Sequence, residues 1–144
     1  SFELHSEQNI ETLQIPLQET ARQFLTCLSD AGIHARILSG TRSYAEQDAL
    51  YAKGRTAPGA KVTNARGGRS NHNFGIAFDI GIFADGKYLT DGVPYSKAGT
   101  LGEALGLEWG GRWKTFKDLA HFQFSSTLTL AQVRQRFENS EWIA

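Results

Sequence analysis

Two short segments of the chain carry side chains that together could hold a metal ion. His72 and Asp79 lie in the segment SNHNFGIAFD, and Asp118 and His121 lie in the segment DLAHF. Two imidazoles and one carboxylate form a ligand set of catalytic zinc, which keeps its fourth position open for water. A second carboxylate beside the last histidine could take a proton from that water. These residue types indicate a hydrolase with one zinc ion.

The spacing of these residues leaves a second interpretation open. His72 and Asp79 are seven positions apart, so on one flat strand they would point to opposite faces. They can converge only if the chain turns between them, and Gly75 is placed to allow that turn. In the alternative, His72 is an ordinary loop histidine, while Asp79 and Asp118 accept hydrogen bonds from nearby backbone N–H groups.

The other histidines and the single cysteine favour structural roles. His5 and His34 have no carboxylate at ligand spacing on the same element, so we expect both at the surface or in loops. Cys27 is the only cysteine, which excludes an internal disulfide and a thiolate zinc cluster. It flanks an apolar helical stripe and is expected to pack as a small hydrophobic side chain.

Composition is typical of one globular domain, which we expect to comprise residues 1–144. The formal net charge is zero, which disfavours nucleic acid as a partner. No apolar run approaches the roughly 18 residues that a membrane helix needs, so no membrane insertion is expected. No signal peptide pattern is present, and we expect a monomer.

Hydrophobic periodicity, glycines and prolines predict alternating helices and strands. Residues 1–15 are polar and are expected to lie on the domain as an arm. Helices are expected over residues 16–31, 44–54, 96–105 and from 130 onward, and strands over 35–38, 76–83, 88–89, 107–109 and 121–124. This order predicts an α+β fold, with a small and largely antiparallel sheet and helices packed on it.

Capping boxes are expected where two of these helices begin. Ser43 and Glu46 have the spacing of such a box, and so do Thr129 and Gln132. Three apolar side chains of the last helix are expected to face inward: Leu130, Val133 and Phe137.

Positive charge is concentrated in the loop that leads to His72. No acidic residue occurs over residues 49–78, a span that contains Lys53, Arg55, Lys61, Arg66 and Arg69. The charges either belong to a solvated loop or guide an anionic substrate toward the metal. The glycines of this loop also make it a candidate for a mobile lid.

Three motifs, in one order, resemble those of a known enzyme family. The pattern SxHxxGxAxD of residues 70–79 is similar to the first zinc motif of the M15 metallopeptidases, which include D-Ala-D-Ala carboxypeptidases and peptidoglycan endopeptidases. Residues 108–123, EWGGRWKTFKDLAHFQ, resemble the second motif, and residues 38–43, LSGTRS, resemble a preceding one. The resemblance covers about residues 6–137 and is strongest to the small L-alanyl-D-glutamate endopeptidases of phage endolysins and bacterial autolysins.

The resemblance implies a role for each matching residue. His72, Asp79 and His121 would bind zinc, Asp118 would be the catalytic acid and base, and Arg42 would stabilise the developing oxyanion. Family members that act on D-Ala-D-Ala usually have glutamate at the position of Asp118, whereas aspartate is typical of the L-Ala-D-Glu branch. The implied fold is that of the D-Ala-D-Ala carboxypeptidases and hedgehog-like zinc peptidases.

The resemblance is less specific for substrate contacts. We expect such contacts from Ser70, Arg69 and Trp109. Trp109 and Trp113 bracket a double glycine, so one could line the cleft while the other joins the core. The chain departs from the family at Arg112, where relatives often have an acidic residue, and at Thr41, where an aromatic residue is usual; the first departure leaves the charge at the cleft edge open.

The sequence therefore predicts a zinc endopeptidase that cuts the L-Ala–D-Glu bond of peptidoglycan stem peptides. A D-Ala-D-Ala carboxypeptidase or dipeptidase on the same scaffold is the first alternative, and a zinc-binding module without catalysis is the second. The joint presence of Arg42, Asp118 and three ligands argues against the second. The enzyme is expected to act at the cell wall or in the periplasm, after lysis or secretion; a phage lysis enzyme, an autolysin and a toxin would share these residues.

Overall fold

A five-stranded antiparallel sheet runs through the fold, which a computed structural model describes for residues 3–144. Its strands are β1 (His34–Ser39), β2 (Ala77–Ala84), β3 (Lys87–Leu89), β4 (Leu107–Trp109) and β5 (His121–Phe124). The strands pair in the order β1-β2-β5-β4, and the short β3 forms a hairpin with the far end of β2. The α+β fold with an antiparallel sheet predicted from the sequence is confirmed.

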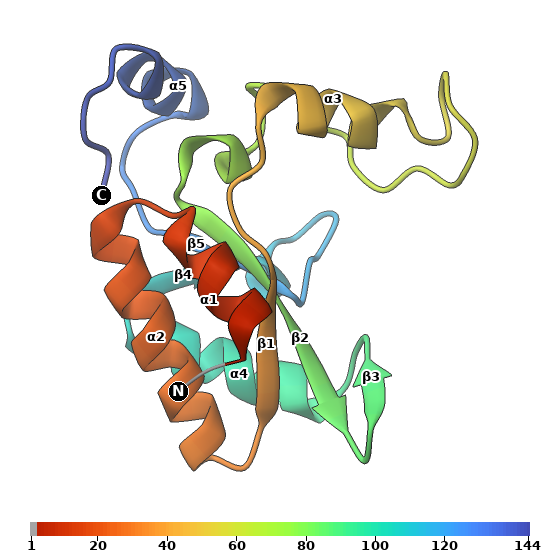
Figure 1. The fold of residues 1–144 in the computed structure, drawn as a ribbon, viewed down its shortest axis with the longest axis vertical. Helices are drawn as coiled ribbons and strands as arrows, with labels where there is room; N and C mark the ends of the chain where they lie inside the picture. Colours follow the sequence, from red (N-terminus) through yellow and green to blue (C-terminus); the bar gives the residue numbers. More distant parts are fainter. Residues whose placement is uncertain (1–2) are drawn as a thin grey trace.

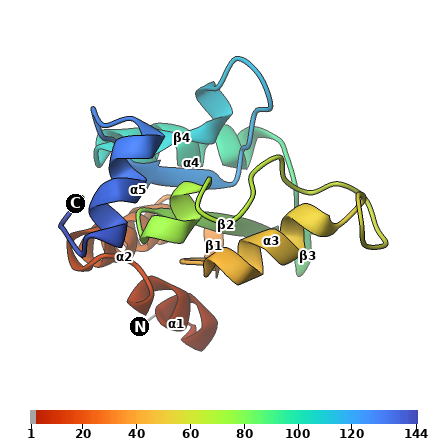
Figure 2. The same ribbon diagram turned by 90° about the horizontal axis from the view of Figure 1, so that it is seen from above.

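Within residues 3–144, five helices and two 3-10 turns accompany the sheet (Figures 1 and 2). They are α1 (Leu4–Glu11), α2 (Ile15–Asp30), α3 (Tyr44–Ala52), η1 (Asn71–Phe74), α4 (Val93–Ala104), η2 (Gly110–Arg112) and α5 (Leu130–Glu138). Helices α1 and α2 pack on β1, and α4 packs on β4 and α2. Helices α3 and α5 lie beyond one end of the sheet, at the top of Figure 1. None of the helices within residues 3–144 has the length and apolarity to span a membrane.

The apolar stripe predicted for α2 forms the centre of the core. Leu17, Ala21, Phe24 and Leu28 recur at helical spacing and are all almost fully buried. The Phe24 ring centroid lies 4.7 Å from that of Phe122 in β5, an aromatic contact that fixes α2 against the middle of the sheet. Helix α2 thus packs against the strands that carry Asp79 and His121.

The N-terminal segment differs from the expected arm, because residues 4–11 form helix α1. The Glu3 side chain caps this helix by accepting hydrogen bonds from the backbone N–H groups of His5 and Ser6. Ile10 is fully buried, and the Ser6 hydroxyl accepts a hydrogen bond from the Ile37 N–H of β1. Residues 1–2 of the expected arm lie outside the described residues.

Two further expectations need correction. Helix α4 begins at Val93 rather than near residue 96, because Pro94 occupies the first turn, where its missing N–H costs no hydrogen bond. In α5 Val133 is buried, and Phe137 faces inward as expected, with its ring centroid 5.4 Å from that of the buried Phe74, although it stays 39% exposed. Leu130 is 37% exposed, so its burial is not confirmed. The capping boxes at the starts of α3 and α5 are present as predicted.

Close packing between α4 and β4 depends on a glycine. A Cβ atom at Gly99 would collide with the indole of Trp109, whose ring packs against that turn of the helix. Trp109 is the last residue before η2, so this contact also sets where the chain leaves the sheet toward residues 110–121.

The substitution Gly99→Ala is expected to lower the free energy of unfolding by about 1–3 kcal/mol, because the added methyl group overpacks the Trp109 contact. An ordinary glycine-to-alanine change inside a helix would instead stabilise by about 0.5–1 kcal/mol. Urea denaturation of the variant measures whether its free energy of unfolding falls or rises. Thr100→Ala, at the exposed neighbouring position, serves as the control and should change stability by less than about 0.5 kcal/mol. A more stable Gly99→Ala protein would contradict the packing described here.

Candidate metal centre

A turn ahead of β2 brings His72 back toward Asp79. The segment Asn71–Phe74 forms the 3-10 turn η1, which Ser70 caps by accepting a hydrogen bond from the His72 N–H at 3.2 Å. Gly75 then adopts a left-handed conformation with φ of 72°, which favours glycine, and β2 begins two residues later. The turn that the sequence predicted at Gly75 is therefore present.

The pairing of β2 with β5 places the second histidine. Asp79 lies directly opposite His121 in the antiparallel register of these strands. Opposed residues of an antiparallel pair point to the same face of the sheet, so the two side chains meet. His121 is the first residue of β5, where the chain enters the sheet from the loop after η2.

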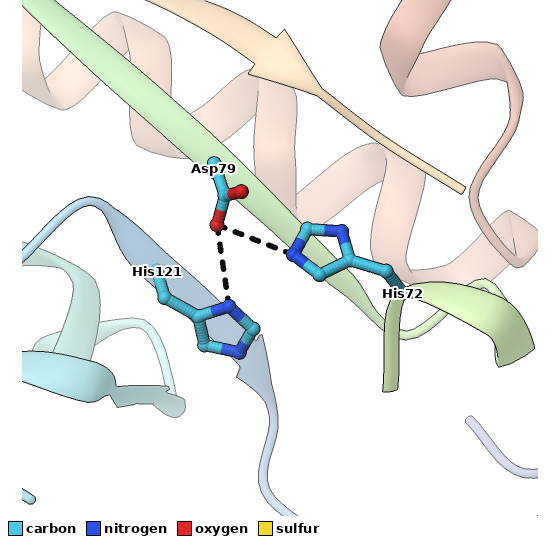
Figure 3. A group of neighbouring side chains, drawn as sticks. All are labelled: His72, Asp79 and His121. Atoms are coloured by element: carbon cyan, nitrogen blue, oxygen red, sulfur yellow. Dashed lines mark hydrogen bonds and ion pairs between the residues drawn. The ribbon is translucent and has the colours of Figure 1, made fainter. Parts of the chain in front are cut away.

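Three potential ligand atoms converge at this point (Figure 3). Asp79 Oδ1 lies 3.2 Å from His72 Nε2 and 3.2 Å from His121 Nδ1. The ligand atoms of the three residues all lie within 4.8 Å of one another, and both histidines are buried. The structure thus brings together all three residues that the sequence singled out as ligands.

The far nitrogen of each imidazole has an oxygen acceptor. His72 Nδ1 lies 2.9 Å from the Gly40 carbonyl oxygen, and His121 Nε2 lies 2.7 Å from Gln123 Oε1. Because these oxygens accept, the far nitrogens carry the protons, and neutral rings turn lone pairs toward Asp79. Two lone pairs facing a carboxylate oxygen need a cation or a proton between them. The donor set therefore fits a divalent metal bound by His72 Nε2, Asp79 Oδ1 and His121 Nδ1.

A network of hydrogen bonds fixes the Gln123 side chain, which accepts from His121 Nε2. Gln123 Oε1, the acceptor of His121, also accepts a hydrogen bond from Asn71 Nδ2 at 3.0 Å. Gln123 Nε2 donates to Glu108 Oε2 at 3.2 Å, and the same oxygen accepts from Trp113 Nε1 at 3.0 Å. Glu108 and Gln123 are directly paired across β4 and β5. The carboxylate of Glu108 thus fixes the orientation of the Gln123 amide, which in turn fixes the imidazole.

The carboxylates of the site titrate in opposite directions. Burial by itself would raise the pKa of Asp79, but when the facing ring nitrogens of His121 and His72 are protonated, their hydrogen bonds outweigh it and hold that pKa well below its usual range. Asp118 is exposed as a whole residue, yet partial burial of its carboxyl group and the nearby charge of Asp79 raise its pKa. Asp79 is therefore kept anionic, while Asp118 is the more basic carboxylate.

One cavity of about 340 Å³ contains the three ligands together with Asp118 and Arg42. The Arg42 N–H of the backbone donates to the His72 carbonyl oxygen at 2.9 Å, which ties the two segments together. Its guanidinium Nη1 lies 3.4 Å from Ser39 Oγ, whereas its buried Nε has no hydrogen-bond partner within the described part of the chain. Asp118 is held by its own N–H, which donates to the Gly110 carbonyl oxygen at 3.1 Å.

The three residues expected to contact substrate have different surroundings. Ser70 lines the cavity, although its hydroxyl also caps η1. Arg69 is exposed and is not among the residues that line the cavity. Trp109 is only 5% exposed, packs on α4 and donates Nε1–H to the Leu119 carbonyl oxygen at 2.9 Å, so it belongs to the core. The expectation for Trp109 as a substrate contact is therefore corrected.

Trp113 is the tryptophan that reaches the site. It lines the cavity, and its ring centroid lies 5.0 Å from that of His121. Sequence reasoning did not assign roles to Gln123 and Glu108 either. The available signals were the spacing of Gln123, two residues after His121 and so on the same face of β5, and the position of Glu108 directly before Trp109.

The basic residues near the site also have distinct roles. Arg55 donates to the carbonyl oxygens of Tyr51 and Thr63 at 2.7 and 3.0 Å, so its charge is committed to the loop itself. Lys53 lines the cavity of the metal ligands. Arg112, the departure from the family pattern, forms an exposed ion pair with Glu103 at 3.0 Å and does not line that cavity.

Comparison with known proteins shows which family this chain resembles. A peptidase M15 family model, described as D-alanyl-D-alanine carboxypeptidase, matches residues 63–124. The chain is 36% identical over 137 residues to the peptidoglycan L-alanyl-D-glutamate endopeptidase CwlK of Bacillus subtilis (strain 168), a match that covers 84% of this chain and 82% of that protein. It is 31% identical over 121 residues to the L-alanyl-D-glutamate peptidase of Listeria phage A118, covering 81% of this chain and 40% of the phage protein.

Solved structures agree on the fold. The L-Ala D-Glu endopeptidase ChiX of Serratia marcescens is similar with a TM-score of 0.66 and 25% identity, covering 86% of this chain and 89% of that one. The vancomycin resistance D,D-pentapeptidase VanY, solved in complex with Zn(II), is similar with a TM-score of 0.58 and 16% identity, covering 90% and 80%. Since the match to the Bacillus subtilis protein extends over four fifths of both sequences, the chain belongs to the M15 family of peptidases.

Proposed function

We propose that this chain is a zinc-dependent endopeptidase that hydrolyses the L-Ala–D-Glu bond of peptidoglycan stem peptides. The observation that carries the proposal is the convergence of His72, Asp79, His121 and Asp118 on one cavity. Two relatives, one bacterial and one from a phage, are named for cleavage at this bond, and each matches more than four fifths of the chain. The site of action would be the cell wall, whether the protein arrives by lysis or by secretion.

In this proposal a single zinc ion is held by His72 Nε2, Asp79 Oδ1 and His121 Nδ1. Zinc supplies Lewis acidity at this position, which favours the ionisation of water and polarises a carbonyl group. The partly buried and anionic Asp79 would offset part of the metal's charge, and the two neutral rings are fixed by their far-side hydrogen bonds. Those hydrogen bonds orient the ligands before any metal binds.

Asp118 acts as general base and then as general acid. Its carboxylate would accept the proton of the attacking water and later donate it to the nitrogen of the leaving amine. Its raised pKa, caused by burial of the carboxyl group and by the nearby charge of Asp79, makes it a stronger base than an ordinary aspartate. The backbone N–H of Asp118 donates to the Gly110 carbonyl oxygen, which holds this residue beside the ligands.

Arg42 donates to the developing oxyanion. Arg42 lines the cavity, and the N–H groups of its guanidinium would be the donors to this oxygen. A well-placed donor of this kind contributes about 3 kcal/mol to transition-state stabilisation in other acyl-transfer enzymes.

A D-Ala-D-Ala carboxypeptidase on the same scaffold is the second candidate, favoured by the description of the matching family model. Digestion of purified sacculi, followed by identification of the new chain ends, separates the two activities. We expect new amino termini at D-glutamate and no release of free D-alanine. Release of D-alanine without new D-glutamate termini would reject the endopeptidase assignment in favour of the carboxypeptidase.

The substitution Asp118→Asn is expected to lower kcat at least about 100-fold, because the amide cannot accept the proton from water. Zinc content, measured by atomic emission on the purified variant, should be unchanged. Asp91→Asn, an exposed change ahead of α4, is the matched control and should retain full activity. If Asp118→Asn instead lost its zinc, Asp118 would be a ligand rather than the base.

The substitution Gln123→Ala is expected to weaken zinc binding about 10- to 100-fold, because the His121 ring loses the acceptor that selects its tautomer. Competition with a chromophoric chelator measures the affinity without reference to turnover. Gln23→Ala, at an exposed position of α2, is the control. An unchanged zinc affinity in a folded Gln123→Ala protein would show that the Glu108–Gln123 pair does not support the site.

A further inference from the structure

A second and larger cavity adjoins the metal site. It has a volume of about 860 Å³, and we call it the lysine groove. One wall is residues 61–65 of the loop after α3, and the other is Trp113 with residues 115–118. The lysine groove and the metal cavity share four lining residues: Val62, Thr63, Trp113 and Asp118. The two spaces therefore join at the proposed general base.

Each wall of the lysine groove carries a lysine next to an exposed apolar side chain. On one wall Lys61 precedes Val62, which is 60% exposed; on the other Lys117 follows Phe116, which is 82% exposed. Phe116 also has a left-handed backbone, with φ of 52°, a conformation that costs a non-glycine residue of order 1 kcal/mol. This backbone conformation places a large apolar ring at the edge of the groove, where the ring does not contribute to the hydrophobic core.

The two lysines differ from Arg55 and Arg66 of the basic loop. Arg55 is hydrogen bonded to two backbone carbonyl groups, and Arg66 lies over the Tyr51 ring at 5.1 Å. Lys61 and Lys117 form no hydrogen bond or ion pair with any residue in the described range 3–144. Asp118 is the single acidic residue of the groove lining, so positive charge predominates along the walls.

We propose that the lysine groove binds the part of the stem peptide on the carboxyl side of the scissile bond, with its carboxylates paired to Lys61 and Lys117. This inference rests on the proposed function. The residues after the scissile bond are acidic, since D-glutamate keeps one free carboxylate and the following diamino acid often carries another, whereas L-alanine has none. Val62 and Phe116 would pack on the aliphatic parts of these residues.

The test compares two soluble stem peptides that differ only in whether the free carboxylate of D-glutamate is amidated. The double variant Lys61→Gln/Lys117→Gln should raise KM on the acidic peptide about tenfold, as expected for two partly solvated ion pairs, and leave kcat within about twofold. On the amidated peptide the double variant and the unchanged protein should differ by less than about threefold, because only the second carboxylate remains. Added salt should reduce kcat/KM of the unchanged protein toward that of the double variant.

The control is Lys87→Gln/Lys97→Gln, which removes two exposed lysines of β3 and α4 and should not affect either peptide. Zinc content is measured for every variant. An unchanged KM on the acidic peptide, or an equal loss on both peptides, would overturn the role of the lysines while leaving the proposed function intact. The proposed function itself fails separately, if the unchanged protein produces no amino terminus at D-glutamate from either peptide.

Discussion

The site depends on the partly buried carboxylate of Asp79 and on the two imidazoles that meet its Oδ1 atom. A carboxylate removed from water is costly unless positive charge or hydrogen-bond donors compensate it. Here the compensation is a cation or a proton held between Asp79 and the facing nitrogens of two histidines, which lie at 3.2 Å and come from different segments of the chain. Much of the fold can be understood as the means by which these segments reach the same face of β2.

The two histidines are supported from opposite edges of the sheet, His72 from the β1 edge and His121 from the β4 edge. His72 is held by the carbonyl group of Gly40, and a side chain at Gly40 would collide with the backbone of Asn9 in α1. The N-terminal helix thus contributes to the position of His72 through the loop that it packs on. His121 is held by Gln123, which is braced by Glu108 on β4. Each ligand is oriented by a neighbour that does not touch the metal position itself.

Charge is divided within the basic loop according to what each side chain can reach. Arg55 and Arg66 surround Tyr51 and stabilise the loop, whereas Lys53 and Lys61 line the cavities beside the metal position. The sequence presents all of these as one cationic cluster in a protein of zero net charge. Because they separate into loop-stabilising and cavity-lining groups, one loop can be ordered and still present positive charge beside the metal position.

The element order and the ligand residues were accessible from the sequence because they depend on local signals. Helical periodicity predicted α2, capping boxes predicted the starts of α3 and α5, and Gly75 predicted the turn between His72 and Asp79. The sequence did not predict α1, because the few apolar residues of this segment give a weak helical pattern. Ile10 is buried only through contacts with distant parts of the chain.

By itself the sequence determined which residues have the chemistry of a zinc peptidase and in which order the elements follow. Only the tertiary structure decided that Asp79 lies opposite His121, that Trp113 rather than Trp109 reaches the site, and that Lys61 and Lys117 face one groove. Strand register, core packing and the pairing of loops are contacts between residues far apart along the chain. Propensity and spacing describe neighbours in sequence, so they carry little information about such contacts.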